Sequence, residues 1–206
     1  MEADKTSSIK PKNWRRWLGI SLMTIGAAII IYPLWPVIRY EILRPEPSFP
    51  YATKLSANPE LFHLPEINTK SEFIPQDNRL VVPKIGVDIP ITEGADENAL
   101  YRGAWRIPYT SNPIDGGNTV LSAHRFQYTA GPMTFFLLPK LEPDDTFIVY
   151  WQGQEYDYQV TDKKVVHRSE VSVLNNTESP QVTLFTCTPV YQRNSEWRLV
   201  IIGEPI

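Results

Sequence analysis

The sequence predicts a mainly β fold, a closed or nearly closed barrel of short strands, that follows one N-terminal transmembrane helix. Two observations favour this fold class. From residue 73 onward, short segments that alternate between apolar and polar residues are separated by turn residues, and few segments have a helical period. Ahead of them lies one uncharged apolar run that is long enough to cross a bilayer as a helix.

The composition limits the classes of function open to the chain. Its 206 residues allow one domain with a sizeable core plus an appendage, and 21% charged with 42% hydrophobic residues exclude wholesale disorder. The net charge of −3 gives no electrostatic basis for binding nucleic acid. A single cysteine excludes an intramolecular disulfide and multi-cysteine metal motifs. The sequence has no compact carboxylate cluster either, so we expect neither a metal nor a cofactor.

Residues 18–38 are predicted to form the transmembrane anchor. They are 21 residues without a charge, enough to span a hydrocarbon core of about 30 Å. Residues 1–17 contain five lysines and arginines against two acidic residues, which keeps them in the cytoplasm and places the rest of the chain outside. Proline, tryptophan and arginine follow where a cleaved signal peptide would carry small residues, which favours a retained single-pass anchor.

The segment after the anchor is expected to be a stalk. Residues 39–72 contain five prolines and no sustained period, which is typical of a semi-rigid extended spacer. The folded domain is then expected at residues 73–206.

The first elements of this domain follow from local pattern. Strands are predicted at 79–86 and 87–92 around a tight turn, and Asp96 can cap a short helix that ends at Tyr101. A short helix or 3₁₀ segment is expected at 132–138. Further strands are predicted at 118–123, 145–151, 155–166, 182–187 and 197–203. The strands at 145–151 and 155–166 are expected to form a hairpin across Gln-Gly-Gln at 152–154.

The only cysteine ends one of these strands. Residues 182–189 read VTLFTCTP, a period-two run of β-branched and aromatic residues with Cys187 near its end and a proline just beyond. A thiol in this place is held on rigid backbone at the rim of a sheet, where a nucleophile can work. The alternative is a buried cysteine that packs as a small hydrophobic residue.

Two further strands carry groups that suit cysteine chemistry. His124 ends one strand and Arg198 opens another. An imidazolium stabilises a thiolate and supplies a proton to a leaving group, while a guanidinium can stabilise the oxyanion formed by attack on an amide. The separations of 63 residues from His124 to Cys187 and 11 from Cys187 to Arg198 are compatible with neighbouring strands, and spacing alone shows no more.

Three motifs together resemble the sortase family: GNTVLSAHR at 117–125, TLFTCTP at 183–189 and RLVI at 198–201. The resemblance covers about residues 73–206 and implies an eight-stranded sortase-like β-barrel on the outer face of a bacterial plasma membrane. It implies a cysteine transpeptidase that cleaves a C-terminal sorting motif of secreted proteins, often similar to Leu-Pro-x-Thr-Gly. The acyl chain would then pass to an amine of a cell-wall precursor or a pilin.

The resemblance also implies a role for each matching residue. Cys187 is the nucleophile that forms a thioester, and His124 is the acid that protonates the leaving amine and later accepts a proton from the incoming one. Arg198 orients substrate and stabilises the oxyanion, with Arg193 in the same loop as its rival. Thr186 is a candidate for lining the substrate groove beside the thiol, or else it packs as an ordinary strand residue.

Some features of the sequence leave the subclass, the choice of histidine and the function open to alternatives. Ala123 stands where sortases commonly have glycine, and no Asp-Pro-aromatic lid precedes the domain, so the subclass is undetermined. His167 is a reserve candidate for the histidine. The loops at 188–196 and 166–179 are expected to determine specificity. The alternatives are another cysteine acyl hydrolase or an L,D-transpeptidase, or a non-catalytic membrane-tethered binding barrel with a buried cysteine.

Overall fold

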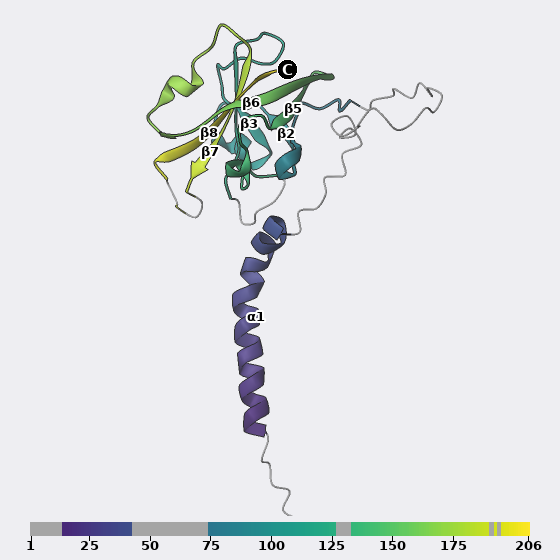
Figure 1. Cartoon of the computed structure of the whole chain (residues 1–206), viewed down its shortest axis with the longest axis vertical. Coiled ribbons are helices and arrows are strands. Elements are labelled where there is room, and N and C mark those ends of the chain that lie inside the picture. The colour runs from purple at the N-terminus through teal and green to yellow at the C-terminus, as the bar shows by residue number, and fades with distance from the viewer. Residues whose placement is uncertain (1–13, 43–73, 127–132, 190–191, 193–194) are drawn as a thin grey trace, which may run out of the picture.

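The computed structural model describes residues 14–42, 74–126, 133–189, 192 and 195–206. The first range is one helix, α1 (Trp14–Ile42), which includes the predicted anchor at 18–38 and continues into the start of the predicted stalk (Figure 1). Among the residues that the structure describes, no helix is both long and apolar enough to cross a membrane. The membrane anchor therefore stays a prediction, and the stalk beyond residue 42 lies outside the described residues.

Eight strands of the described chain close into a barrel, which confirms the mainly β fold class (Figure 1). The parallel pairs are β2 with β3 and β4 with β7, and all other neighbours are antiparallel. In order around the barrel, the strands are β1 (Arg79–Val82), β2 (Val87–Thr92), β3 (Ala104–Arg106), β4 (Asn118–Ser122), β7 (Gln181–Thr188), β8 (Trp197–Pro205), β6 (Gln154–His167) and β5 (Thr146–Trp151).

Within the described ranges, four short 3₁₀ helices connect the strands: η2 (Pro83–Ile85), η3 (Glu97–Tyr101), η4 (Leu138–Lys140) and η5 (Val171–Leu174). The Asp96 side chain accepts a hydrogen bond of 3.0 Å from the Asn98 backbone N–H, so the predicted cap of η3 is confirmed. The helix expected at 132–138 is displaced, because 3₁₀ geometry begins only at Leu138.

The hairpin between β5 and β6 is also confirmed. Gln152 and Gly153 at its tip both have positive φ angles, 50° and 74°, and two such residues in a row match the right-handed twist of the flanking strands. The predicted run at 79–86 is divided, because η2 interrupts it and ends at Gly86 in the left-handed region with φ of 63°.

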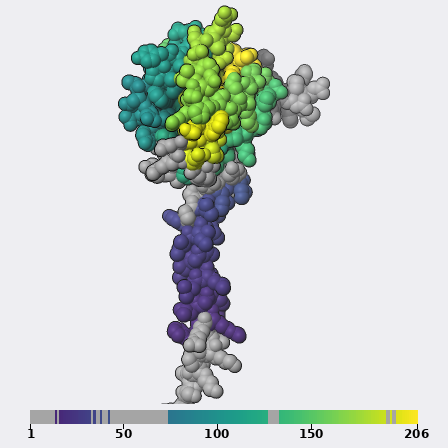
Figure 2. Space-filling view, turned by 90° about the vertical axis from the view of Figure 1, so that its left-hand side faces the viewer, coloured from purple at the N-terminus to yellow at the C-terminus, as the bar shows by residue number. Residues whose placement is uncertain are grey.

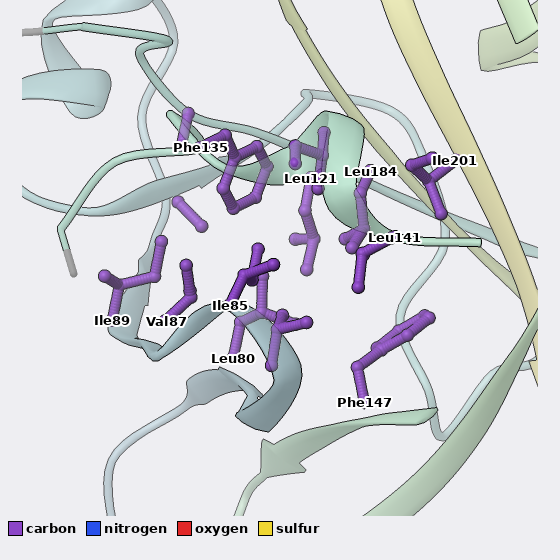
Figure 3. Packing of buried hydrophobic residues seen from close by; sticks show 14 of the residues in the cluster. Leu80, Ile85, Val87, Ile89, Leu121, Phe135, Leu141, Phe147, Leu184 and Ile201 are labelled. Atoms are coloured by element: carbon purple, nitrogen blue, oxygen red, sulfur yellow. The ribbon is translucent and has the colours of Figure 1, made fainter. Parts of the chain in front are cut away.

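The interior of the barrel is filled by one apolar cluster (Figure 3). Leu121, Leu184 and Ile201 are paired across β4, β7 and β8, and none of them is exposed to solvent. Burial of each such side chain contributes about 1.5–3 kcal/mol to the hydrophobic driving force. This interior row decides which residues of the same strands face outward, because side chains alternate along a strand.

Candidate active site

Cys187 and Arg198 lie on the neighbouring strands β7 and β8, and His124 follows two residues after the end of β4. Cys187 of β7 pairs directly with Arg198 of β8. The parallel pairing of β4 with β7 joins residues that are 63 positions apart, as far as Ser122 with Phe185. His124 and Cys187 keep the same separation, and a 2.8 Å hydrogen bond from Thr186 to the carbonyl of Ala123 keeps the two segments adjacent one residue before them. The barrel therefore brings the three predicted residues into one row, with the thiol in the middle.

This row lies on the outer face of the barrel. The preceding row, Ala123, Thr186 and Leu199, is buried at 3%, 1% and 4% exposure and faces the interior with the rest of the core. Alternation along the strands then turns the row of His124, Cys187 and Arg198 outward. Cys187 is exposed. The alternative of a buried, merely structural cysteine is therefore wrong.

Thr186 lies inside the barrel and not beside the thiol. Its hydroxyl donates a hydrogen bond of 2.8 Å to the backbone carbonyl of Ala123, so it ties β7 to β4 one residue before Cys187 and His124. The expectation that Thr186 lines the substrate groove conflicts with this burial, since Thr186 and Cys187 point to opposite faces of β7. Thr186 therefore ties the segment that leads to His124 to the strand that carries Cys187.

His124 is half-buried against η3. Its ring lies 5.3 Å from the ring of Tyr101, centroid to centroid, at an angle of 57°. Its Nε2 atom is buried, and none of the groups that the structure describes forms a hydrogen bond with it. Burial lowers the pKa of His124 below its ordinary value, and the nearby carboxylate of Glu97 opposes the shift. This environment favours the neutral imidazole, the form that can accept a proton.

Tyr101 and Glu97 were not among the residues predicted for the site. The sequence does indicate that Asp96 caps a short helix ending at Tyr101. It carries no signal that this helix packs over His124, because the contact joins segments that are distant in the chain.

Arg198 is held at the base of the loop after β7. Its Nη1 donates hydrogen bonds to the carbonyls of Ser195, at 2.7 Å, and Trp197, at 2.9 Å. The Ser195 hydroxyl in turn donates to the carbonyl of Thr188, which closes the loop onto the end of β7. Arg193 lies outside the described residues. Pairing with Cys187 therefore favours Arg198 as the arginine of the site.

The reserve histidine is not part of the row. His167 ends β6, pairs with Trp197 and lies edge-on to its ring at 5.5 Å. Its Nδ1 is 2.7 Å from the hydroxyl of Ser169. Because β8 separates β6 from β7, His167 is one strand further from the thiol than Arg198.

A groove adjoins the row on its β8 side. It has a volume of about 90 Å³, and Phe185, Arg198 and Val200 form its floor on β7 and β8. The segment after β6, which carries η5, forms the other wall and lies on the face shown in Figure 2. Phe185 shares the outward face of β7 with Cys187, so strand alternation in the sequence could have identified it as a groove residue.

Among the described residues, no group of three or more histidine, cysteine and acidic side chains is placed to hold a metal ion.

Comparison with known proteins shows which family this chain resembles. The family model described as a sortase domain matches residues 80–206. Sortase D of Bacillus subtilis is 27% identical over 147 residues, which cover 68% of this chain and 71% of that protein. Sortase A of Listeria monocytogenes is 29% identical over 126 residues, which cover 61% of this chain but only 54% of its relative.

Solved structures agree with the sequence relatives. Sortase C-1 from Actinomyces oris matches with a TM-score of 0.57 and 36% identity over 65% of this chain and 76% of that one. Sortase C1 of GBS Pilus Island 1 matches with the same TM-score and 33% identity over 64% and 66%. The chain therefore belongs to the sortase family of cysteine transpeptidases.

Proposed function

We propose that this protein cleaves a C-terminal sorting motif of secreted proteins and transfers the acyl fragment to an amine, with Cys187, His124 and Arg198 as its catalytic residues. The observation that supports the proposal is strand register: the exposed Cys187 pairs with Arg198, and the pairing of β4 with β7 runs toward His124 with the same 63-residue offset. We further propose a motif similar to Leu-Pro-x-Thr-Gly, by resemblance to the family.

The reaction begins with proton transfer. The neutral imidazole of His124 accepts the thiol proton of Cys187, and the thiolate attacks the carbonyl carbon of the scissile amide. The carbonyl oxygen becomes an oxyanion, which the Arg198 guanidinium stabilises. As the C–N bond breaks, the His124 imidazolium protonates the departing amine and a thioester to Cys187 remains.

The second half returns the enzyme to its starting state. An acceptor amine attacks the thioester and loses a proton to His124, the Cys187 thiolate departs, and the proton returns to sulfur. A cell-wall precursor and a pilin both present a suitable amine, and hydrolysis by water is the competing reaction. No cofactor is needed for any of these steps, since nucleophile, acid, base and oxyanion donor all come from the chain.

We also propose that residues 18–38 anchor the protein in a bacterial plasma membrane, with residues 1–17 in the cytoplasm and the 73–206 domain outside on a stalk at 39–72. The support is the 21-residue uncharged run and the basic residues ahead of it. Because Cys187 is the only cysteine and is exposed, a membrane-impermeant maleimide added to intact cells should label it. Labelling only after lysis would contradict this orientation.

The activity is tested with the full chain, purified in a mild detergent. A panel of sorting-motif peptides is incubated with it, with and without an amine such as triglycine, and the products are identified by mass spectrometry. We expect cleavage inside one motif, an acyl adduct on Cys187 and an amine-dependent product, all absent from Cys187→Ala. A folded wild-type chain that gives neither adduct nor cleavage with any peptide would contradict the proposed function.

A further inference from the structure

A second and larger hollow lies behind the groove at Arg198. It has a volume of about 340 Å³, against about 90 Å³ for the groove. The two share Val166, Glu170 and Val173 as lining residues, so they adjoin one another beside the segment that carries η5, and we call the pair the depression. That segment lies on the face of the barrel shown in Figure 2. No step of the proposed reaction uses this second hollow.

The depression runs along β7 and away from the nucleophile. Phe185, which faces outward two residues before Cys187, lines the groove, and Gln181, which lies six residues before it, lines the hollow. On β8 the same progression leads from Val200 in the groove to Ile202 in the hollow. At about 3.3 Å per strand residue, the level of Gln181 is roughly 20 Å from the thiol.

The catalytic row fixes which end of a substrate enters this depression. His124 protonates the leaving amine, so the part of the substrate after the scissile bond lies on the β4 side of Cys187. The acyl part then lies on the opposite side, where Arg198 and the groove are. The four motif residues before the scissile bond span about 13 Å when extended. If the acyl part follows the groove and the hollow along β7, the residues that precede the motif reach the level of Gln181.

The far wall of the hollow is fixed by a buried side chain. Asn118 is 1% exposed, and its Nδ2 donates hydrogen bonds of 3.0 Å to the carbonyls of Val173 and Asn175. Its backbone N–H donates to the Asn176 side-chain oxygen, also at 3.0 Å. These bonds hold the segment from Val173 to Asn176 against β4, so the hollow is a built feature of the barrel face.

The lining points to the class of side chain that fits. Amide and hydroxyl groups are present at Asn175, Asn176, Thr177 and Gln181, beside the apolar side chains of Val166, Val173 and Ile202. Its two charged members, Lys164 and Glu170, have opposite signs, so the hollow favours neither an acidic nor a basic group.

We propose that this hollow is a subsite for the two or three residues that precede the sorting motif, and that it selects polar, uncharged side chains there. The inference rests on the proposed function, because it takes the direction of the substrate from the role of His124. Together with the groove, the subsite makes recognition depend on a segment longer than the motif itself.

The test compares peptides that share the cleaved motif. One begins at the motif, one carries three preceding residues of Ser, Asn and Gln, and two carry three Glu or three Lys instead. With the full wild-type chain, the polar extension is expected to raise kcat/KM about tenfold over the minimal peptide, and the charged extensions much less. The enzyme variants are Thr177→Trp, which fills the hollow, and Ser179→Trp, an exposed control that does not line it.

The readout is the ratio of kcat/KM for the polar-extended and minimal peptides within each variant, which cancels any difference in folded fraction. The ratio is expected to fall to about one in Thr177→Trp and to stay about ten in Ser179→Trp. Equal cleavage of extended and minimal peptides by the wild type would overturn the subsite while leaving the proposed function intact. An equal gain from all three extensions would overturn its selectivity. Absence of cleavage and of a Cys187 adduct with every peptide would overturn the proposed function and the subsite with it.

Discussion

Thr186→Val tests whether one buried hydroxyl holds the two catalytic strands together. Valine has nearly the shape of threonine, so the change removes the 2.8 Å bond to the Ala123 carbonyl without opening a cavity. Thr186 is 1% exposed and Ala123 is 3% exposed, so water cannot replace the lost donor. An acceptor left buried without its partner costs about 1–3 kcal/mol, and we expect the free energy of unfolding to fall by that amount.

The same substitution should also slow catalysis. The bond lies one residue before His124 and Cys187, so its loss lets β4 shift relative to β7 and misaligns the imidazole with the thiol. A displacement of a fraction of an ångström is expected to lower kcat about tenfold. Urea denaturation followed by intrinsic fluorescence measures the stability, and cleavage of the motif peptide measures kcat.

A matched control separates this bond from a general effect of losing a threonine hydroxyl. Thr161→Val removes a hydroxyl from an exposed position on β6 and should change stability by less than about 0.5 kcal/mol and leave kcat unchanged. If Thr186→Val were as stable and as active as Thr161→Val, the reasoning that assigns Thr186 a positioning role would be refuted.

Three further predictions concern the catalytic row. Cys187→Ala should lower the cleavage rate by roughly 10³-fold or more and abolish the acyl adduct seen by mass spectrometry, and an adduct elsewhere would displace Cys187 as nucleophile. Arg198→Gln should lower kcat/KM by about 10²-fold while Arg193→Gln changes it far less, and the reverse order in the same assay would reassign the arginine. Tyr101→Ala should raise the pKa of His124 toward its ordinary value, because burial keeps that pKa low, and an NMR titration of the imidazole measures it. Between the folded and the ordinary pKa the unfolded chain binds the proton more tightly, so wild-type stability falls as the pH drops through this window, and Tyr101→Ala should weaken that dependence. An unchanged His124 pKa in Tyr101→Ala would show that the tyrosine does not shield the ring.

Local pattern was enough to predict much of the barrel. The alternation in VTLFTCTP identified β7, the Gln-Gly turn identified the hairpin of β5 and β6, and Asp96 identified the cap of η3. Each of these signals depends on a few consecutive residues and their own backbone preferences. β3 was missed, since its three residues are too few to show a period.

Alternation in the sequence also indicates which side chains of β7 face the core, and it argues against the expectation that Thr186 lines the groove. Thr186 has the same parity as Val182 and Leu184, which are buried, whereas Phe185 has the parity of Cys187. Alternation therefore places Thr186 in the core and Phe185 beside the thiol.

The sequence by itself predicted Cys187 as the nucleophile with His124 and Arg198 as its partners, because cysteine chemistry uses those types of residue and the motifs around them resemble one family. Only the tertiary structure decided which residues meet. Parallel pairing of β4 with β7 sets the 63-residue offset that His124 and Cys187 share, and packing of η3 brings Tyr101 onto His124. Both contacts join segments far apart in the chain, and their geometry follows from closing one barrel around a common core, which no local pattern encodes.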